Sequence, residues 1–205
     1  MGAEFPSVHH DLGYVETLLT RLRLPFLLKH FPPKFVWSVY VCANSFITIA
    51  LLALLGEVTH SPFVFPSLGP TAYLFFFTPL AEVACPRNTI LGHGVGLVCG
   101  YAAFRMTGMH TFSAGTPGIF WPRILSAALA LALTASIMVV LSISHPPAGA
   151  TTLIVALGIL FEPRFLIMIE AAVVLLTAQA WVINHLAGLP YPVWRYRRAD
   201  GPPVR

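Results

Sequence analysis

The stretch Ser144-His145-Pro146-Pro147-Ala148-Gly149-Ala150-Thr151-Thr152-Leu153 interrupts a long apolar run and decides how the rest of the chain is interpreted. Residues 124–143 before it match the roughly 20 residues that cross a bilayer as a helix, and residues 153–161 after it are apolar again. Two successive prolines remove two backbone donors and clash with the preceding turn, so one straight helix through both runs is excluded. Broken backbone at membrane depth is tolerated only where protein or a wet cavity surrounds it. This segment is therefore the first candidate for a site.

The composition is that of a membrane protein. Of the 205 residues, 57% are hydrophobic and only 10% are charged, whereas a soluble domain carries about 25% charged residues. One integral domain with about four to six crossings is expected at this length. The net charge of +4 does not indicate nucleic-acid binding, because the basic residues flank the apolar body instead of forming one face. The flanking basic residues are Arg21, Arg23, Lys29, Lys34, Arg195, Arg197, Arg198 and Arg205.

The positive-inside rule places both tails in the cytoplasm and the protein in the inner (plasma) membrane as a multi-pass protein. Residues 1–34 are expected to form a cytoplasmic amphipathic segment, residues 35–185 the membrane domain, and residues 186–205 a basic cytoplasmic tail. In the first segment Val15, Leu18, Leu19 and Leu22 repeat at helical spacing, which favours a helix on the membrane surface. No signal peptide is visible, so the first membrane helix is expected to direct insertion.

Clear helical spans are predicted over residues 36–55, 89–104, 124–143 and 165–183. Between the first two lies a second interrupted stretch, residues 62–79, which is apolar but contains four prolines and a glycine. Pro70 suits the first position of a helix with Gly69 as its cap. A helix from Pro70 to Thr78 is too short to cross an apolar core of about 30 Å, so it is interpreted as a half-helix or an interrupted span.

The two halves of the chain have the same layout, which predicts an inverted repeat of three elements each. A clear span is followed by a short segment broken by proline and glycine, then by a Pro-Arg pair and another clear span. Gly69-Pro70-Thr71-Ala72 corresponds to Gly149-Ala150-Thr151-Thr152, and Pro86-Arg87 corresponds to Pro163-Arg164. Interrupted segments at matching places in two halves are typical of a transporter binding site.

The predicted fold is an all-α, polytopic helical membrane protein with four full spans plus two half-helices, or alternatively six spans. With four spans, Arg105 and Arg123 are cytoplasmic, while Arg87 and Arg164 lie outside. With six, Arg87 is cytoplasmic and the other three are not. The charge rule tilts the prediction toward four.

A small anion is the natural ligand of such a fold, because a helix that starts inside the membrane leaves unpaired N–H groups and partial positive charge at its start. Two starts that meet about a pseudo-two-fold axis would share one site. The predicted substrate-binding residues are Ser67, Gly69, Thr71, His145, Gly149, Thr151 and Thr152. Pro70, Pro146 and Pro147 are interpreted as the structural helix breaks.

Three titratable groups in apolar surroundings are candidates for proton coupling or for buried polar packing. His145 could carry a proton-linked charge beside the anion, or it could cap the broken backbone and never meet solute. His93 is interpreted first as a hydrogen-bonded residue of a helix interface. Glu170 could act with His145 as a proton relay, or pair with Arg87 or His93 to lock helices together.

Two helix faces are marked by spacing. Gly92, Gly96 and Gly100 form a small-residue stripe that could serve internal packing or a homo-oligomer. Glu170, Thr177 and Asn184 share one face of the last span, which must point away from lipid. Cys42, Cys85 and Cys99 are scattered, so neither a disulfide framework nor a metal site is predicted, and no cofactor is expected.

At these residues the chain resembles the HPP family of integral membrane proteins over roughly residues 35–185. The resemblance rests on Ser67-Leu68-Gly69-Pro70-Thr71-Ala72, on Pro86-Arg87-Asn88 with Gly92-His93, and on His145-Pro146-Pro147-Ala148-Gly149-Ala150. The family is usually described as having four membrane helices and as transporters, with plant chloroplast and cyanobacterial relatives linked to nitrite. The resemblance therefore implies a carrier or channel for a small anion, with nitrite as the named substrate. The CBS domains of some bacterial relatives are not expected here.

Two other function classes compete with transport. A structural or assembly protein would use the broken helices only for compact packing. A membrane-embedded enzyme would use His93, His145 and Glu170 as metal ligands, but no HExxH or comparable paired spacing is present, so a non-enzyme is predicted.

Overall fold

The computed structural model describes residues 23–112, 118 and 120–196. The described part is all helical, without strands, which confirms that the fold is all-α. Its α-helices are α2 (Leu24–His30), α3 (Pro33–Thr59), α4 (Leu68–Phe77), α5 (Pro86–Met106), α6 (Trp121–Val140), α7 (Ala148–Ala156) and α8 (Pro163–Leu186), with two 3-10 turns, η1 (Glu82–Ala84) and η2 (Met109–Thr111). The amphipathic repeat predicted around Val15 and Leu22 lies outside the described residues.

Proline marks the beginning of most of these helices, because the first turn has no use for the missing N–H. A proline occupies the first or second position of α2, α3, α5, α6 and α8. The short helix α4 is different, and our prediction that it starts at Pro70 is wrong by two residues. The N–H of Leu68 already donates to the Phe65 carbonyl at 2.9 Å, so the helical turn begins before the proline.

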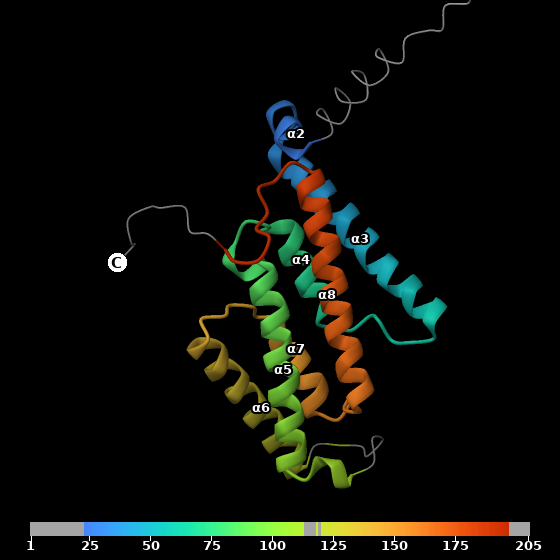
Figure 1. Ribbon diagram of the computed structural model, residues 1–205, viewed down its shortest axis with the longest axis vertical. Coiled ribbons are helices and arrows are strands. Elements are labelled where there is room, and N and C mark those ends of the chain that lie inside the picture. Colours follow the sequence, from blue (N-terminus) through green and yellow to red (C-terminus); the bar gives the residue numbers. More distant parts are fainter. Residues whose placement is uncertain (1–22, 113–117, 119, 197–205) are drawn as a thin grey trace, which may run out of the picture.

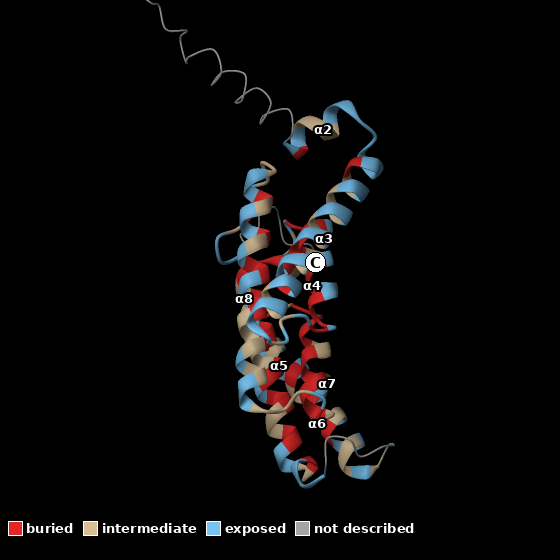
Figure 2. Ribbon diagram, turned by 90° about the vertical axis from the view of Figure 1, so that its right-hand side faces the viewer, coloured by how far each residue is buried: buried red, intermediate tan, exposed pale blue. Residues whose placement is uncertain are grey.

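Three described helices are long and apolar enough to cross a membrane: α3, α6 and α8. Helix α5 has a comparable length of 21 residues, but glycines and polar side chains dilute its apolar character. It also occupies the centre of the bundle, where it packs against α6, α7 and α8 (Figure 1). Helix α3 leans away from the bundle and exposes most of its apolar surface, with Phe46 75% exposed and Val58 71% exposed (Figure 2). Such a surface suits contact with lipid.

The small-residue stripe of α5 serves packing inside the chain. A Cβ added to Gly96 would lie 2.8 Å from the Ala148 carbonyl oxygen, and one added to Gly100 would lie 2.7 Å from the Thr152 carbonyl oxygen. Gly92 faces His145 in the same way. Because α7 of the same chain covers this face, the stripe is not free to bind a second copy.

The short helices α4 and α7 start beside each other and run in opposite directions (Figure 1). The end of α4 reaches Asn184 near the end of α8, where the Asn184 amide donates to the Phe75 carbonyl at 3.2 Å. The end of α7 reaches the opposite end of the bundle, where Ser126 of α6 donates to the Ala156 carbonyl at 2.8 Å. In chain order the bundle therefore reads long, short, long helix twice.

A C-terminal strap, residues 187–196, folds back over the end of the bundle that carries α2. The N–H of Leu24 donates to the Ala187 carbonyl at 2.9 Å, and the N–H of Arg87 donates to the Trp194 carbonyl at 3.0 Å. The Tyr191 hydroxyl donates to the Ala84 carbonyl. Burial raises the pKa of the Tyr191 phenol, so this donor stays protonated at neutral pH. Both ends of the described chain thus lie at the same end of the bundle.

Candidate functional site

The two interruptions in the helical sequence meet inside the bundle. Residues 61–65 and 143–145 are not helical and lead into α4 and α7. Thr71 lies in the first turn of α4, and His145 precedes α7. The Thr71 Oγ1 atom is 3.3 Å from the His145 Nε2 atom, so the two helix starts lie side by side.

His93 of α5 completes a triangle with these two side chains. Its Nε2 atom is 3.1 Å from Thr71 Oγ1 and 3.2 Å from His145 Nε2. Each of the three residues is 0% exposed. The triangle of Thr71, His93 and His145 is called the histidine cluster below. His93 is thus a hydrogen-bonded residue of a helix interface, as interpreted from the sequence, and the interface is the one between α5 and both broken helices.

The outer ring nitrogens determine where the imidazole protons lie. His145 Nδ1 is 2.8 Å from the Val83 carbonyl oxygen, which can only accept, so Nδ1 carries a hydrogen. In a neutral ring His145 Nε2 is then a bare acceptor. His93 Nε2 faces it and must donate, which leaves His93 Nδ1 to accept the Thr151 hydroxyl proton at 2.7 Å. Thr71 donates to the Ser67 carbonyl at 2.9 Å, so every polar atom of the neutral cluster is paired.

This arrangement can take up one additional proton. A proton on His145 Nε2 would point at His93 Nε2, which would then have to accept. His93 would carry its hydrogen on Nδ1 and donate it to the Thr151 hydroxyl. The cluster thus has two hydrogen-bonding states that differ by one positive charge, and in the charged state the Thr151 hydroxyl accepts from His93 instead of donating to it. Two charges at 3.2 Å would repel strongly.

The backbone amides at the start of α7 are not bare, contrary to expectation. The N–H groups of Ala148, Gly149 and Ala150 donate to the carbonyls three residues earlier, at 3.1, 3.0 and 3.1 Å. The two residues before them are prolines, which have no N–H. Side chains, not α7 amides, are therefore the groups that this break presents to its surroundings.

The other predicted substrate-binding residues lie in different places. Ser67 is fully buried at the start of α4, and its hydroxyl has no partner in the part of the chain that the structure describes. Gly69 is exposed and no atom lies within 4 Å of a Cβ added there. Gly149 faces Leu131 of α6. Thr152 is bonded to Thr134 of α6 at 3.0 Å, and its hydroxyl oxygen also faces Gly96 of α5.

The three breaking prolines differ in exposure: Pro70 and Pro146 are exposed, whereas Pro147 is buried. Thr151, which was predicted to bind substrate, contacts the histidine cluster through its hydrogen bond with His93. Two contributors were missed. Thr89, one helical turn before His93, lies 3.4 Å from His145 Nδ1, and the backbone of Val83 is the main partner of that nitrogen. The spacing of Thr89 and His93 on one face of α5 could have indicated the first, but no sequence signal marks a carbonyl.

Glu170 does not form the helix-locking pair that the sequence suggested. Its Oε2 atom is buried without a partner among the described residues, and the carboxylate faces Gly94 of α5. Arg87 instead donates to the carbonyls of Leu141 and Ser142 at the end of α6, each at 3.1 Å. Among the described residues the ion pair is between Arg164 and Glu162, at 2.7 Å.

The prediction that Glu170 shares an inward face with Thr177 and Asn184 is confirmed. Thr177 is 4% exposed and Asn184 is 0% exposed. The Asn184 side chain accepts from the Tyr40 hydroxyl of α3 at 2.8 Å, a partner that sequence did not reveal. This bond ties the leaning helix α3 to α8.

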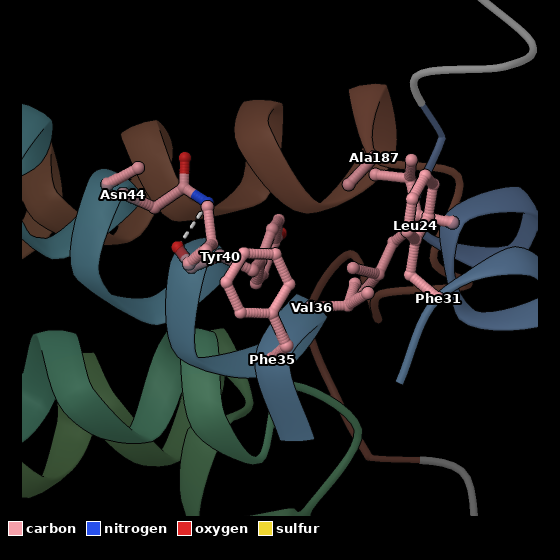
Figure 3. A pocket seen from close by; sticks show the side chains of 10 residues that line it. Leu24, Phe31, Phe35, Val36, Tyr40, Asn44 and Ala187 are labelled. Atoms are coloured by element: carbon pink, nitrogen blue, oxygen red, sulfur yellow. Dashed lines mark hydrogen bonds between the residues drawn. The ribbon is translucent and has the colours of Figure 1, made fainter. Parts of the chain in front are cut away.

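An apolar pocket of about 320 Å³ lies between α2 and α3, away from the histidine cluster (Figure 3). Leu24, Phe31, Phe35 and Val36 line it, and Asn44 donates to the Tyr40 carbonyl at its far end. Nothing in its chemistry indicates a polar solute. Within the part of the chain that the structure describes, no three His, Cys, Asp or Glu side chains gather to hold a metal ion.

The fold and the cluster define a polytopic helical membrane protein with a buried pair of histidines between two broken helices. The chain belongs to the family described as HPP, transmembrane region, whose family model matches residues 31–192. It is also similar to two Dictyostelium discoideum proteins named as transmembrane proteins. One is 28% identical over 133 residues, 62% of this chain and 44% of that protein. The other is 36% identical over 115 residues, 54% of this chain and 34% of that protein.

This chain therefore spans less than half the length of these relatives. No solved structure matches it. The relatives' names say that they are membrane proteins and nothing of what they carry.

Proposed function

We propose that this protein transports a small anion across a membrane, with nitrite as the first substrate to test. The single observation that carries the proposal is the histidine cluster, because it lies where two broken helices meet. Titratable side chains inside a membrane cost free energy and typically mark a path for a solute or a proton. The family membership and the resemblance of its motifs to nitrite-linked relatives support the same class of function.

The direction of the helices supports six crossings, the alternative to four. Each short helix follows a non-helical segment. A short helix and the segment before it would together cross the membrane once. Arg87 then lies with the chain ends, as its bond to Trp194 indicates. Arg105 and Arg164 lie at the opposite end (Figure 1). In this proposal the end that carries Lys29, Lys34 and Arg195 faces the cytoplasm, because positive charge favours that side of the plasma membrane.

The proton states of the cluster suggest why anion movement would be coupled to protons. In the neutral state the His145 Nε2 lone pair accepts from His93, and the cluster carries no charge. After one proton is added, the pair of histidines carries one positive charge, which attracts an anion. Transport by this mechanism carries one proton with each monovalent anion, so its rate rises as pH falls.

Proteoliposomes test this function directly. Purified protein is reconstituted and uptake of nitrite, nitrate, formate and chloride is measured between pH 5 and pH 8. Replacing His93 with Gln keeps a donor but removes the proton exchange, and the lost charge-assisted hydrogen bond predicts a fall of about tenfold to a hundredfold in nitrite uptake. His110→Gln, an exposed histidine of η2, is the matched control and should leave uptake unchanged.

Glu170 offers a second carrier of the coupled proton, because its buried oxygen has no partner within residues 23–112, 118 and 120–196. Glu170→Gln keeps the shape and removes the titration. A flattened pH profile with intact uptake at low pH is the expected result for a relay. An unchanged profile would remove Glu170 from the mechanism and leave the histidine cluster alone in it.

A structural or assembly role is the second candidate, and one observation favours it: the neutral histidine cluster satisfies all its own hydrogen bonds. A protein of this kind would show no uptake of any of the four anions. Its His93→Gln variant would be less stable, while no flux would be lost.

A further inference from the structure

A polar pocket of about 640 Å³ opens at the end of the bundle that carries both ends of the described chain. Its walls come from three separate elements: the turn η1 with the start of α5, the end of α6, and the C-terminal strap. The polar residues that line it are Glu82, Arg87, Asn88, Ser142 and Arg195, and Cys85 lies beside them. The pocket is called the arginine vestibule below.

The floor of the vestibule touches the histidine cluster. Cys85 lines the pocket, and its carbonyl accepts from the Thr89 hydroxyl at 3.2 Å. The same Thr89 oxygen lies 3.4 Å from His145 Nδ1, and Val83, two residues before Cys85, accepts from that nitrogen. Only the turn over residues 83–85 therefore separates the vestibule from the ring of His145.

The charge of the vestibule favours anions. The Arg87 guanidinium donates to the carbonyls of Leu141 and Ser142 and to the side-chain oxygen of Asn88 at 3.1 Å. All three acceptors are uncharged, so they hold the guanidinium in place without cancelling its charge. Arg195 is exposed on the strap. Glu82 is the acidic residue of the lining, and it forms no ion pair with the described residues, so the lining has an excess of positive charge.

We propose that the arginine vestibule is the entrance that collects small monovalent anions on the side of the chain ends and delivers them to the histidine cluster. This inference rests on the proposed function. Arg87 is a fixed part of the wall because it also donates hydrogen bonds to the last carbonyls at the end of α6. Arg195 supplies charge that can be removed without disturbing a helix, so it is the residue on which the test depends.

Charged thiol reagents measure the local potential without any transport assay. Ser142→Cys is introduced into full-length protein in which Cys42, Cys85 and Cys99 have been replaced. The detergent-solubilised protein is treated with the negatively charged and the positively charged methanethiosulfonate reagents, and the two rates are compared by mass spectrometry. The negative reagent should react faster on the order of fivefold, and less so in high salt. Arg195→Gln should bring the ratio close to one.

Arg105→Gln, at the opposite end of α5, is the matched control and should leave the ratio unchanged. In liposomes, Arg195→Gln should raise the KM for nitrite severalfold with little change in the maximal rate. Equal rates for the two reagents, or a Ser142→Cys thiol that neither reagent reaches, would contradict the proposal that the vestibule collects anions.

The two proposals fail separately. A charge-selective vestibule with no flux of any anion contradicts the transport function but leaves the anion-collecting pocket standing. Proton-linked flux through a pocket with no charge preference contradicts the vestibule and leaves transport standing.

Discussion

The two short helices have equivalent places in the chain but are held by opposite kinds of packing. Helix α7 presents Ala148 and Thr152 to α5, and its backbone lies directly against Gly96 and Gly100 of α5. Helix α4 is held by large side chains: Phe75 and Phe76 are each 0% exposed and pack edge-on against Tyr191 and Tyr40. The difference teaches that one position in a membrane fold can be secured by close backbone approach or by aromatic filling.

These two kinds of packing have different tolerance. Backbone contact leaves no room for an added methyl group, whereas a packed ring can be replaced by another large side chain that fills the same volume. Helix α7 is therefore the fixed partner of α5. Helix α4 has open space at Gly69 in its first turn, so it should tolerate substitutions better than α7.

The largest expected effect is loss of an aromatic side chain under α4. Phe75→Ala leaves a cavity beside Tyr191 and should lower the free energy of unfolding by about 3 kcal/mol. Phe75→Leu should cost less than about 1.5 kcal/mol, because volume is nearly kept. Unfolding in mixed micelles with a rising fraction of sodium dodecyl sulfate measures both. Phe77→Ala, at a side chain 49% exposed, is the control. An equal loss for Phe75→Ala and Phe77→Ala would show that α4 is not held by aromatic filling.

A somewhat smaller loss is expected where α5 meets α7. Gly96→Ala places a methyl group 2.8 Å from two oxygen atoms of α7, and the forced separation should cost about 2 kcal/mol. Gly94→Ala, two residues away, meets its nearest atoms at 4.0 Å. It should be neutral or stabilising by up to about 1 kcal/mol, because alanine favours the helix. The same micelle titration compares the two variants. Similar stability would contradict close backbone packing at α7.

The smallest effect compares one hydroxyl group at each short helix. Ser126→Ala removes the donor to the Ala156 carbonyl at the end of α7 and should cost about 1 kcal/mol. Ser67→Ala removes a buried hydroxyl that has no partner at the start of α4, so stability should stay the same or rise slightly. Thermal unfolding in detergent resolves the sign. A clear loss in Ser67→Ala would mean that this hydroxyl binds a group, such as water or a solute, when the protein is folded.

Much of the fold was predictable because apolar length and proline position act locally. The predicted span over residues 36–55 became α3, and the span over residues 165–183 became α8, each extended by a few residues to the nearest proline. The break before α7 was predictable for the same reason, since two prolines exclude a continuous helix.

The partners of the polar groups were not predictable from one sequence. The stripe of Gly92, Gly96 and Gly100 shows that a helix approaches closely, but the spacing cannot say whether α7 or a second copy does so. His93 has the same local signature whether it packs or joins a cluster. The bond of His145 to Val83 depends on how η1 folds over α5, which is a tertiary property.

The opposed directions of α4 and α7 have an electrical consequence. A peptide helix is positive at its beginning and negative at its end, so two helices that diverge from a common point cancel along the axis through which a solute would move. The two helix starts lower the electrostatic energy of an anion at the junction, and neither side of the membrane is favoured over the other. An anion would therefore gain the same dipole energy at the junction whichever end of the bundle it entered from.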